Sequence, residues 1–102
     1  MVFIIGEVRF GAGEIERLRP AMHASIEAAR VEDGCLAYAY SVDILEPDVL
    51  RIAERWRDRA AADVHMRQNA IRSFMAAVRQ AKVEALSVRL YDGETVVTLL
   101  GD

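Results

Sequence analysis

Two short stretches, Glu54-Arg55-Trp56 and Asp63-Val64-His65, hold the residues best suited to chemistry. They place the chain's only Trp and one of its two His residues on either side of a predicted strand-to-helix turn. The indole of Trp56 can stack on a flat molecule or donate its N–H to an oxygen. The imidazole of His65 can accept a phenolic proton. Each residue also has a structural interpretation, with Trp56 as an anchor of the core and His65 as a half-exposed surface residue.

Glu54 is the odd polar residue on an otherwise apolar strand face. A lone buried carboxylate is costly, so this side chain needs a partner or a raised pKa. We expect an ion pair with an arginine on a nearby strand, such as Arg9 or Arg89. The alternative is that Glu54 acts as a base or accepts a hydrogen bond from the substrate.

Other polar residues are weaker candidates. Tyr38 and Tyr40 lie two residues apart, so they share one strand face and can project their hydroxyls toward a cavity beneath the helices. Asn69 is placed to cap the next helix, and we favour that role over a contact with the substrate. His23 has no polar residue at a suitable spacing, and we expect it on the surface. Cys35 has no basic neighbour to lower its pKa and is expected to be inert.

Several functions are excluded by composition and spacing. A net charge of −3 argues against nucleic-acid binding. The two histidines form no metal motif, and Gly11-Ala12-Gly13 lacks the fingerprint of a nucleotide-binding loop. We therefore expect no metal and no cofactor. The single cysteine, together with the lack of a signal-like or membrane-spanning segment, predicts a soluble cytoplasmic protein.

Hydrophobic periodicity predicts one α+β domain over residues 1–102. Strands are predicted over residues 2–10, 35–43, 49–57, 84–91 and 95–100, and helices over residues 14–31, 58–66 and 69–80. This order is that of a ferredoxin-like fold, an antiparallel sheet with helices on one face. The last strand is expected to fold back as a hairpin or to reach across to a partner subunit.

The apolar content predicts a homodimer. Hydrophobic residues make up 53% of the chain, which is high for a body of 102 residues. Phe3 and Ile5 lie on the sheet face away from the helices, and this face needs a cover. Two such sheets meeting face to face would provide it.

The chain resembles the antibiotic biosynthesis monooxygenase (quinol-monooxygenase-like) family. The resemblance is carried by Gly34-Cys35-Leu36-Ala37-Tyr38, Asp43, Pro47, Glu54-Arg55-Trp56, Asp63, His65, Phe74 and Val88-Arg89-Leu90-Tyr91. It implies a dimeric α/β barrel that oxidises a small phenol, anthrone or quinol with O₂ and no cofactor. An electron-rich phenolate or carbanion passes an electron to O₂ itself, so the protein need only deprotonate, desolvate and cage the pair.

The resemblance also implies roles for particular residues. Trp56 would orient the substrate and His65 would assist proton movement, while Tyr38, Tyr40, Glu54, Asn69 and Phe74 would contact the substrate. Many relatives carry a second His five residues after the first, where this chain has Ala70, which puts a two-histidine relay in doubt. Two alternatives remain on the same fold. One is a non-catalytic binder of small ligands, and the other is a haem-binding or haem-degrading protein.

Overall fold

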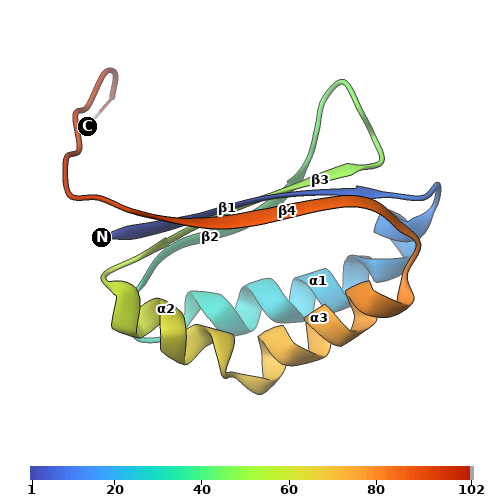
Figure 1. Ribbon diagram of the computed structural model, residues 1–102, viewed down its shortest axis with the longest axis horizontal. Coiled ribbons are helices and arrows are strands. Elements are labelled where there is room, and N and C mark those ends of the chain that lie inside the picture. Colours follow the sequence, from blue (N-terminus) through green and yellow to red (C-terminus); the bar gives the residue numbers. More distant parts are fainter. Residues whose placement is uncertain (102) are drawn as a thin grey trace.

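A computed structural model describes residues 1–101, which form one four-stranded antiparallel sheet with three helices against one face (Figure 1). The elements in chain order are β1 (Val2–Phe10), α1 (Glu14–Arg30), β2 (Cys35–Val42), β3 (Val49–Trp56), α2 (Arg59–Met66), α3 (Asn69–Gln80) and β4 (Val83–Asp92). The strand order across the sheet is β2-β3-β1-β4. The predicted α+β, ferredoxin-like architecture is confirmed.

The register of the sheet determines which side chains face the helices. In β3, buried and exposed residues alternate up to the buried Trp56, as expected for a strand covered on one face. Glu54 pairs with Ile4 of β1 on one side and with Tyr38 of β2 on the other. Tyr38 and Glu54 are therefore direct cross-strand neighbours on the helix-covered face, close enough for their side chains to interact.

The core consists of two apolar clusters under the helices. The larger one comprises Val8, Phe10, Ile15, Leu18, Met22, Leu50, Ile52, Ile71 and Phe74. The smaller one comprises Val2, Ile4, Ala29, Tyr38, Trp56, Ala61 and Ala62. Tyr40 is partly buried and packs against both clusters. It therefore stands at the boundary between them.

Two helix starts differ in how they are capped. Asp58 caps α2 as predicted, since its side chain accepts a hydrogen bond of 2.9 Å from the Ala61 N–H. The prediction that Asn69 caps α3 is wrong. Gln68, with an extended backbone, is the N-cap residue of α3, and Asn69 is the first residue of the helix. The exposed Asn69 side chain is therefore one position too late to cap it.

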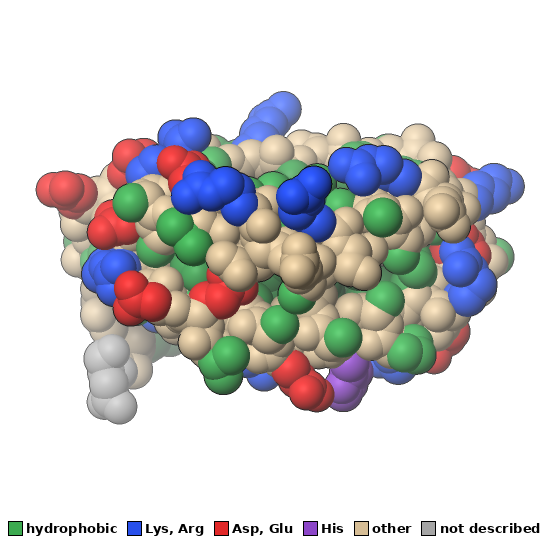
Figure 2. Space-filling model, turned by 90° about the horizontal axis from the view of Figure 1, so that it is seen from below, with side chains coloured by type: hydrophobic (Ala, Val, Ile, Leu, Met, Phe, Trp, Pro, Cys, Tyr) green, Lys and Arg blue, Asp and Glu red, His purple; other side chains and the backbone are tan. Residues whose placement is uncertain are grey.

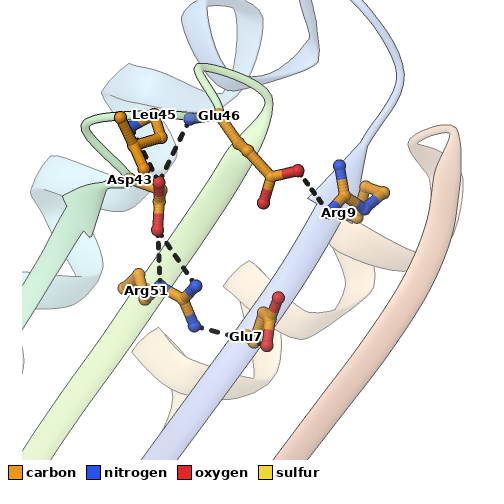
Figure 3. A network of polar contacts seen from close by, with 6 residues as sticks. All are labelled: Glu7, Arg9, Asp43, Leu45, Glu46 and Arg51. Atoms are coloured by element: carbon orange, nitrogen blue, oxygen red, sulfur yellow. Dashed lines mark hydrogen bonds and ion pairs between the residues drawn. The ribbon is translucent and has the colours of Figure 1, made fainter.

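A polar network closes the β2–β3 hairpin (Figure 3). The Asp43 carboxylate accepts hydrogen bonds from the backbone N–H groups of Leu45 and Glu46 and from the Arg51 guanidinium. Arg51 also lies 3.3 Å from Glu7 of β1. Arg9 pairs with Glu46 at 3.0 Å. Arg9 is thereby committed to the hairpin, so it is not the partner expected for Glu54.

The prediction that residues 95–100 fold back as a strand of the same sheet is wrong. These residues form no strand, and Val97 and Leu100 are 71% and 93% exposed. After β4 the Gly93 N–H donates a hydrogen bond to the Met1 carbonyl, and the chain then runs away from the sheet (Figure 1). A strand needs a neighbouring strand to pair with, and residues 1–101 offer none along this path. The alternative that this segment reaches a partner subunit stays a prediction.

The sheet face away from the helices carries exposed apolar side chains. Ile5 and Tyr91 are each about half exposed. Arginines on the same face, among them Arg51, Arg55 and Arg89, separate these apolar side chains along the strands. Across residues 1–101, none of the helices combines the length and apolarity needed to cross a lipid bilayer.

Candidate functional site

His65 lies at the centre of a buried polar cluster, defined here as Glu32, Glu54, Trp56 and His65. Its side chain is 2% exposed. The Nδ1 atom of His65 is 2.9 Å from Oε2 of Glu32, and the Nε2 atom is 3.8 Å from Oε1 of Glu54. The imidazole stacks on the Trp56 ring with centroids 4.6 Å apart. One imidazole is thus held between two carboxylates and an indole.

Local structure explains how these residues meet. β3 ends at Trp56, and the Asp58 cap starts α2 at once, which turns His65 back over the end of the sheet. Glu32 comes from the turn after α1. That turn is tied to the end of β3 by a 2.8 Å hydrogen bond from the Arg57 N–H to the carbonyl of Gly34, which has a φ of 83°.

Burial sets the electrostatics of Glu54. Removal from water raises the pKa of this carboxyl above its usual value, and the hydrogen bond from Trp56 Nε1 (3.0 Å) and the nearby His65 imidazole oppose that rise. A carboxylate can only accept, so the hydrogen between Glu32 and His65 belongs to Nδ1 while Glu32 is ionised. Nε2 of His65 then has no hydrogen-bond partner within the described residues and faces Glu54.

Two tyrosines lie beside this cluster. The hydroxyls of Tyr38 and Tyr40 are 2.7 Å apart, and the Tyr40 hydroxyl is also 3.3 Å from Oγ of Ser25. The Tyr38 ring meets the His65 ring edge to face, with centroids 5.3 Å apart. Burial raises the pKa of both tyrosines, of Tyr38 far above its ordinary range. Both hydroxyls are therefore protonated and can donate hydrogen bonds or pass protons on.

A cavity of about 350 Å³ lies between α3 and the sheet and extends to the edge strand β4. Its wall is made by Val8, Phe10, Tyr40, Leu50, Ile52, Met66, Ile71, Phe74, Met75, Val78, Arg79, Leu86 and Val88. Tyr40 and Arg79 are the only lining residues with hydroxyl or charged groups. The Tyr40 and Phe74 rings are 5.3 Å apart and form a continuous aromatic wall. The cavity surface is almost wholly apolar, with Tyr40 contributing mainly its ring and Arg79 mainly its aliphatic stem, and such an apolar hollow is typical of small-molecule sites.

The predicted site residues fall into two groups. Tyr40 and Phe74 line the cavity. Four more, Tyr38, Glu54, Trp56 and His65, are buried and do not line it, and the seventh, Asn69, belongs to neither group. The Tyr38–Tyr40 hydroxyl contact is the hydrogen bond that joins the two groups.

Three expectations need correction. His65 is buried, so its interpretation as a half-exposed surface residue is wrong. Glu54 pairs with no arginine, because its partners are Trp56 and His65. Asn69 lines neither the cavity nor the cluster, since it points outward from the start of α3.

Glu32 was not singled out from the sequence. It reads there as part of the Glu32-Asp33-Gly34 turn, and its partner His65 is 33 residues away. Other minor expectations hold: His23 is exposed, with 73% of its side chain accessible. Burial and nearby carboxylates raise the pKa of the Cys35 thiol, which keeps it protonated and unreactive.

The fold defines a small ferredoxin-like domain, and comparisons with known proteins identify its family. The sequence pattern of the antibiotic biosynthesis monooxygenase family matches residues 1–77. The chain belongs to this family.

Two solved structures that bear the family's name are similar to this chain. A crystal structure from Deinococcus radiodurans, named as a proposed antibiotic biosynthesis monooxygenase, is 27% identical with a TM-score of 0.91 and covers 99% of this chain and 100% of its own. A second, named antibiotic biosynthesis monooxygenase, is 26% identical with a TM-score of 0.84, covering 93% and 100%. An uncharacterized Synechocystis protein is 23% identical over 88% of this chain. The match spans 61% of that relative's length.

Proposed function

We propose that this protein is a cofactor-independent monooxygenase that oxidises a small aromatic phenol, anthrone or quinol with O₂. The observation that carries the proposal is the hydrogen bond between Tyr40, in the cavity wall, and Tyr38, beside the buried polar cluster. It joins an apolar space suited to a flat substrate to groups able to take a proton. The family supports an activity of this general kind.

The cavity suits a flat aromatic substrate. Its volume of about 350 Å³ falls within the range of small-molecule sites. A ring placed along Tyr40 and Phe74 would stack on an aromatic wall, and a phenolic oxygen could meet the Tyr40 hydroxyl. The apolar lining excludes water from the reacting groups, which protects an anionic intermediate from reprotonation.

The chemistry begins with loss of a proton from the substrate. The resulting anion transfers an electron to O₂, and the two radicals combine to form a carbon–oxygen bond. The resulting peroxide takes back the first proton, and loss of water from the hydroperoxide gives a carbonyl, so one oxygen atom of O₂ enters the product and the other leaves as water. In an anthrone both hydrogens of that water come from the CH₂ group. In a phenol or quinol one comes from the hydroxyl and the other from the ring C–H that is oxidised.

The chain's own residues would accept the first proton. The Tyr40 hydroxyl takes it while passing its own proton to the Tyr38 hydroxyl. Tyr38 would in turn release its own proton to the carboxylate of Glu54, its cross-strand neighbour, which is the final acceptor. Glu54 has a pKa raised by burial, which brings a carboxylate closer to the value a general base needs near neutral pH. Trp56 orients Glu54 through its indole N–H and stacks on His65.

The proposal includes a homodimer formed by the single domain of residues 1–102, in the cytoplasm. The half-exposed Ile5 and Tyr91 on the open sheet face support pairing with a second copy, which would cover them. Light scattering at micromolar concentration tests this assembly. A monomer there would remove the argument from the open face.

Two other functions on the same fold are weaker. Haem binding would need a histidine as iron ligand, but the residues of the cavity wall include none. Nδ1 of His65 is already paired with Glu32. A non-catalytic ligand binder would need the cavity alone and gives no role to the tyrosine pair or the buried polar cluster.

Oxygen uptake tests the proposal. Purified protein would be given a panel of quinols and anthrone with no cofactor added, against blanks for spontaneous oxidation. We expect uptake above the blank that falls in His65→Ala and Trp56→Phe and persists in His23→Ala, which changes only an exposed histidine. Uptake that is equal in all variants would leave the activity but remove the site. No uptake with any substrate would favour the ligand binder.

A further inference from the structure

We propose that the substrate is an aromatic acid, with its ring in the cavity and its carboxylate bound by Arg79 at the cavity mouth. This inference rests on the proposed function for the reaction, but it concerns binding and can be tested without turnover. It begins from the one charged side chain in the cavity wall, Arg79 of α3.

Arg79 sits at the open side of the cavity. Its neighbours in the wall across the opening are Leu86 and Val88 of β4, which are 59% and 51% exposed although they face the helices. The opening therefore lies between α3 and β4, with Arg79 on one rim and apolar side chains on the other. The lining surface is almost wholly apolar, so Arg79, an exposed residue, contributes its aliphatic stem to the rim and leaves its guanidinium to the solvent side of the opening.

The Arg79 guanidinium has no ion-pair partner within residues 1–101, unlike many arginines of this chain. Arg9, Arg17, Arg19, Arg51, Arg57 and Arg59 each pair with a carboxylate. An arginine in an apolar wall with no acid beside it is available to a ligand. Its planar group can hold a carboxylate through two parallel hydrogen bonds.

The surroundings add positive charge. Residues 64–83 contain no Asp or Glu, but they contain Arg67, Arg72, Arg79 and Lys82, in a chain whose net charge is −3. Figure 2, which looks onto the helical layer, shows a row of Lys and Arg side chains along one long edge, much of it without acidic neighbours. Local potential at this edge attracts anions to the mouth of the cavity.

Two acidic residues that border or contact residues 64–83 are already paired. Asp63 lies 3.1 Å from Arg59. Glu14 binds the Arg17 guanidinium and the Lys82 N–H, which together lower its pKa to about 2. Neither carboxylate is free to neutralise Arg79.

The two halves of the site together define the ligand class. Arg79 favours a ligand with an anionic group, and the Tyr40–Phe74 wall favours a flat ring over a flexible chain because a ring can stack on it. A phenol or quinol that bears a carboxylate satisfies both, and its hydroxyl can still meet Tyr40.

Calorimetric titration with two ligands that cannot be oxidised in this way, 2-naphthoate and 2-naphthamide, tests the inference. They have the same shape and differ in charge. We expect naphthoate to bind about tenfold more tightly, because hydrogen bonds to charged groups are the stronger ones. The preference should shrink in about 0.5 M salt, where screening is strong.

Two matched variants locate the effect. Arg79→Gln should abolish the preference for naphthoate while naphthamide binding changes little. Arg72→Gln lies on the same helix, outside the cavity wall, and should keep most of the preference. Equal binding of the two ligands, no binding of either, or equal effects of the two variants would overturn the inference. If the preference is found but no quinol is oxidised, the aromatic-acid site stands and the proposed oxygenase activity fails.

Discussion

Oε2 of Glu32 lies 2.9 Å from Nδ1 of His65, in an interior where the histidine side chain is almost wholly buried. The contact joins the turn after α1 to α2, two segments that share no strand pairing. It fixes the orientation of the imidazole so that Nε2 faces Glu54 on β3. Glu32 is thus a positioning residue for His65.

Replacing Glu32 with Ala should destabilise the fold by about 1–3 kcal/mol, because a buried nitrogen loses its only close partner. Urea unfolding measures the change. Glu27→Ala is the matched control, since 78% of the Glu27 side chain is exposed on α1, and its effect should stay within about 0.5 kcal/mol. Equal losses in the two variants would contradict the role given to Glu32.

Tyr40→Phe should lower the rate of substrate oxidation by about tenfold or more, since it removes the hydroxyl that joins cavity and cluster. The ring remains, so the free energy of unfolding should fall by only about 0.5–1.5 kcal/mol. Oxygen uptake and urea unfolding measure the two effects. Tyr91→Phe, on the open sheet face, should alter neither. Full activity in Tyr40→Phe would remove the proposed proton route.

Gly34→Ala should destabilise the fold by at least about 2 kcal/mol, for two reasons that controls can separate. Gly34 has a φ of 83°, and an added Cβ would lie 2.6 Å from Cβ of Ala61 on α2. Gly13 has a similar φ of 82° but open space around it, so Gly13→Ala reports the backbone penalty alone, about 1–2 kcal/mol. Thermal unfolding measures both. If the two variants lose the same stability, the turn is not packed against α2 as described.

The buried carboxyl of Glu54 should give stability an unusual pH dependence. Its pKa is raised in the folded protein, so folding favours its protonated form. Its contribution is therefore most favourable below the unfolded pKa of about 4.5 and is lost as pH rises through the folded pKa. Glu54→Gln cannot titrate, so this variant should gain stability relative to the native chain as pH rises from about 4 to 7. A difference in free energy of unfolding that is constant with pH would show that burial does not raise the Glu54 pKa.

Most of the fold was predictable because its signals are local. Alternation in the strands, helical spacing in α3 and the Asp58 cap each involve residues within a few positions of one another. The Glu32–His65 contact was not predictable in this way, because only the completed fold brings its residues together. The strand expected over residues 95–100 failed for a related reason. Apolar residues there show a tendency to form a strand, but they do not show whether a partner strand is within reach.

The candidate site was predictable in part. The spacing of Tyr38 and Tyr40 correctly indicated that they share one face of β2. The positions of Glu54, Trp56 and His65 on a strand and the helix after it indicated that they lie close together, and all three are buried and in contact. Their separation into a cavity wall and a buried cluster depends on how α3 packs over the sheet. Sequence spacing carries no information about that packing.

The most direct measurement is the incorporation of ¹⁸O from ¹⁸O₂ into product, with cofactor-free protein and an electron-rich phenol, anthrone or quinol. The account predicts one labelled oxygen per product molecule, formed faster than in the protein-free blank and much more slowly with His65→Ala. Product that forms no faster than in the blank across the whole panel would contradict the proposed oxygenase activity.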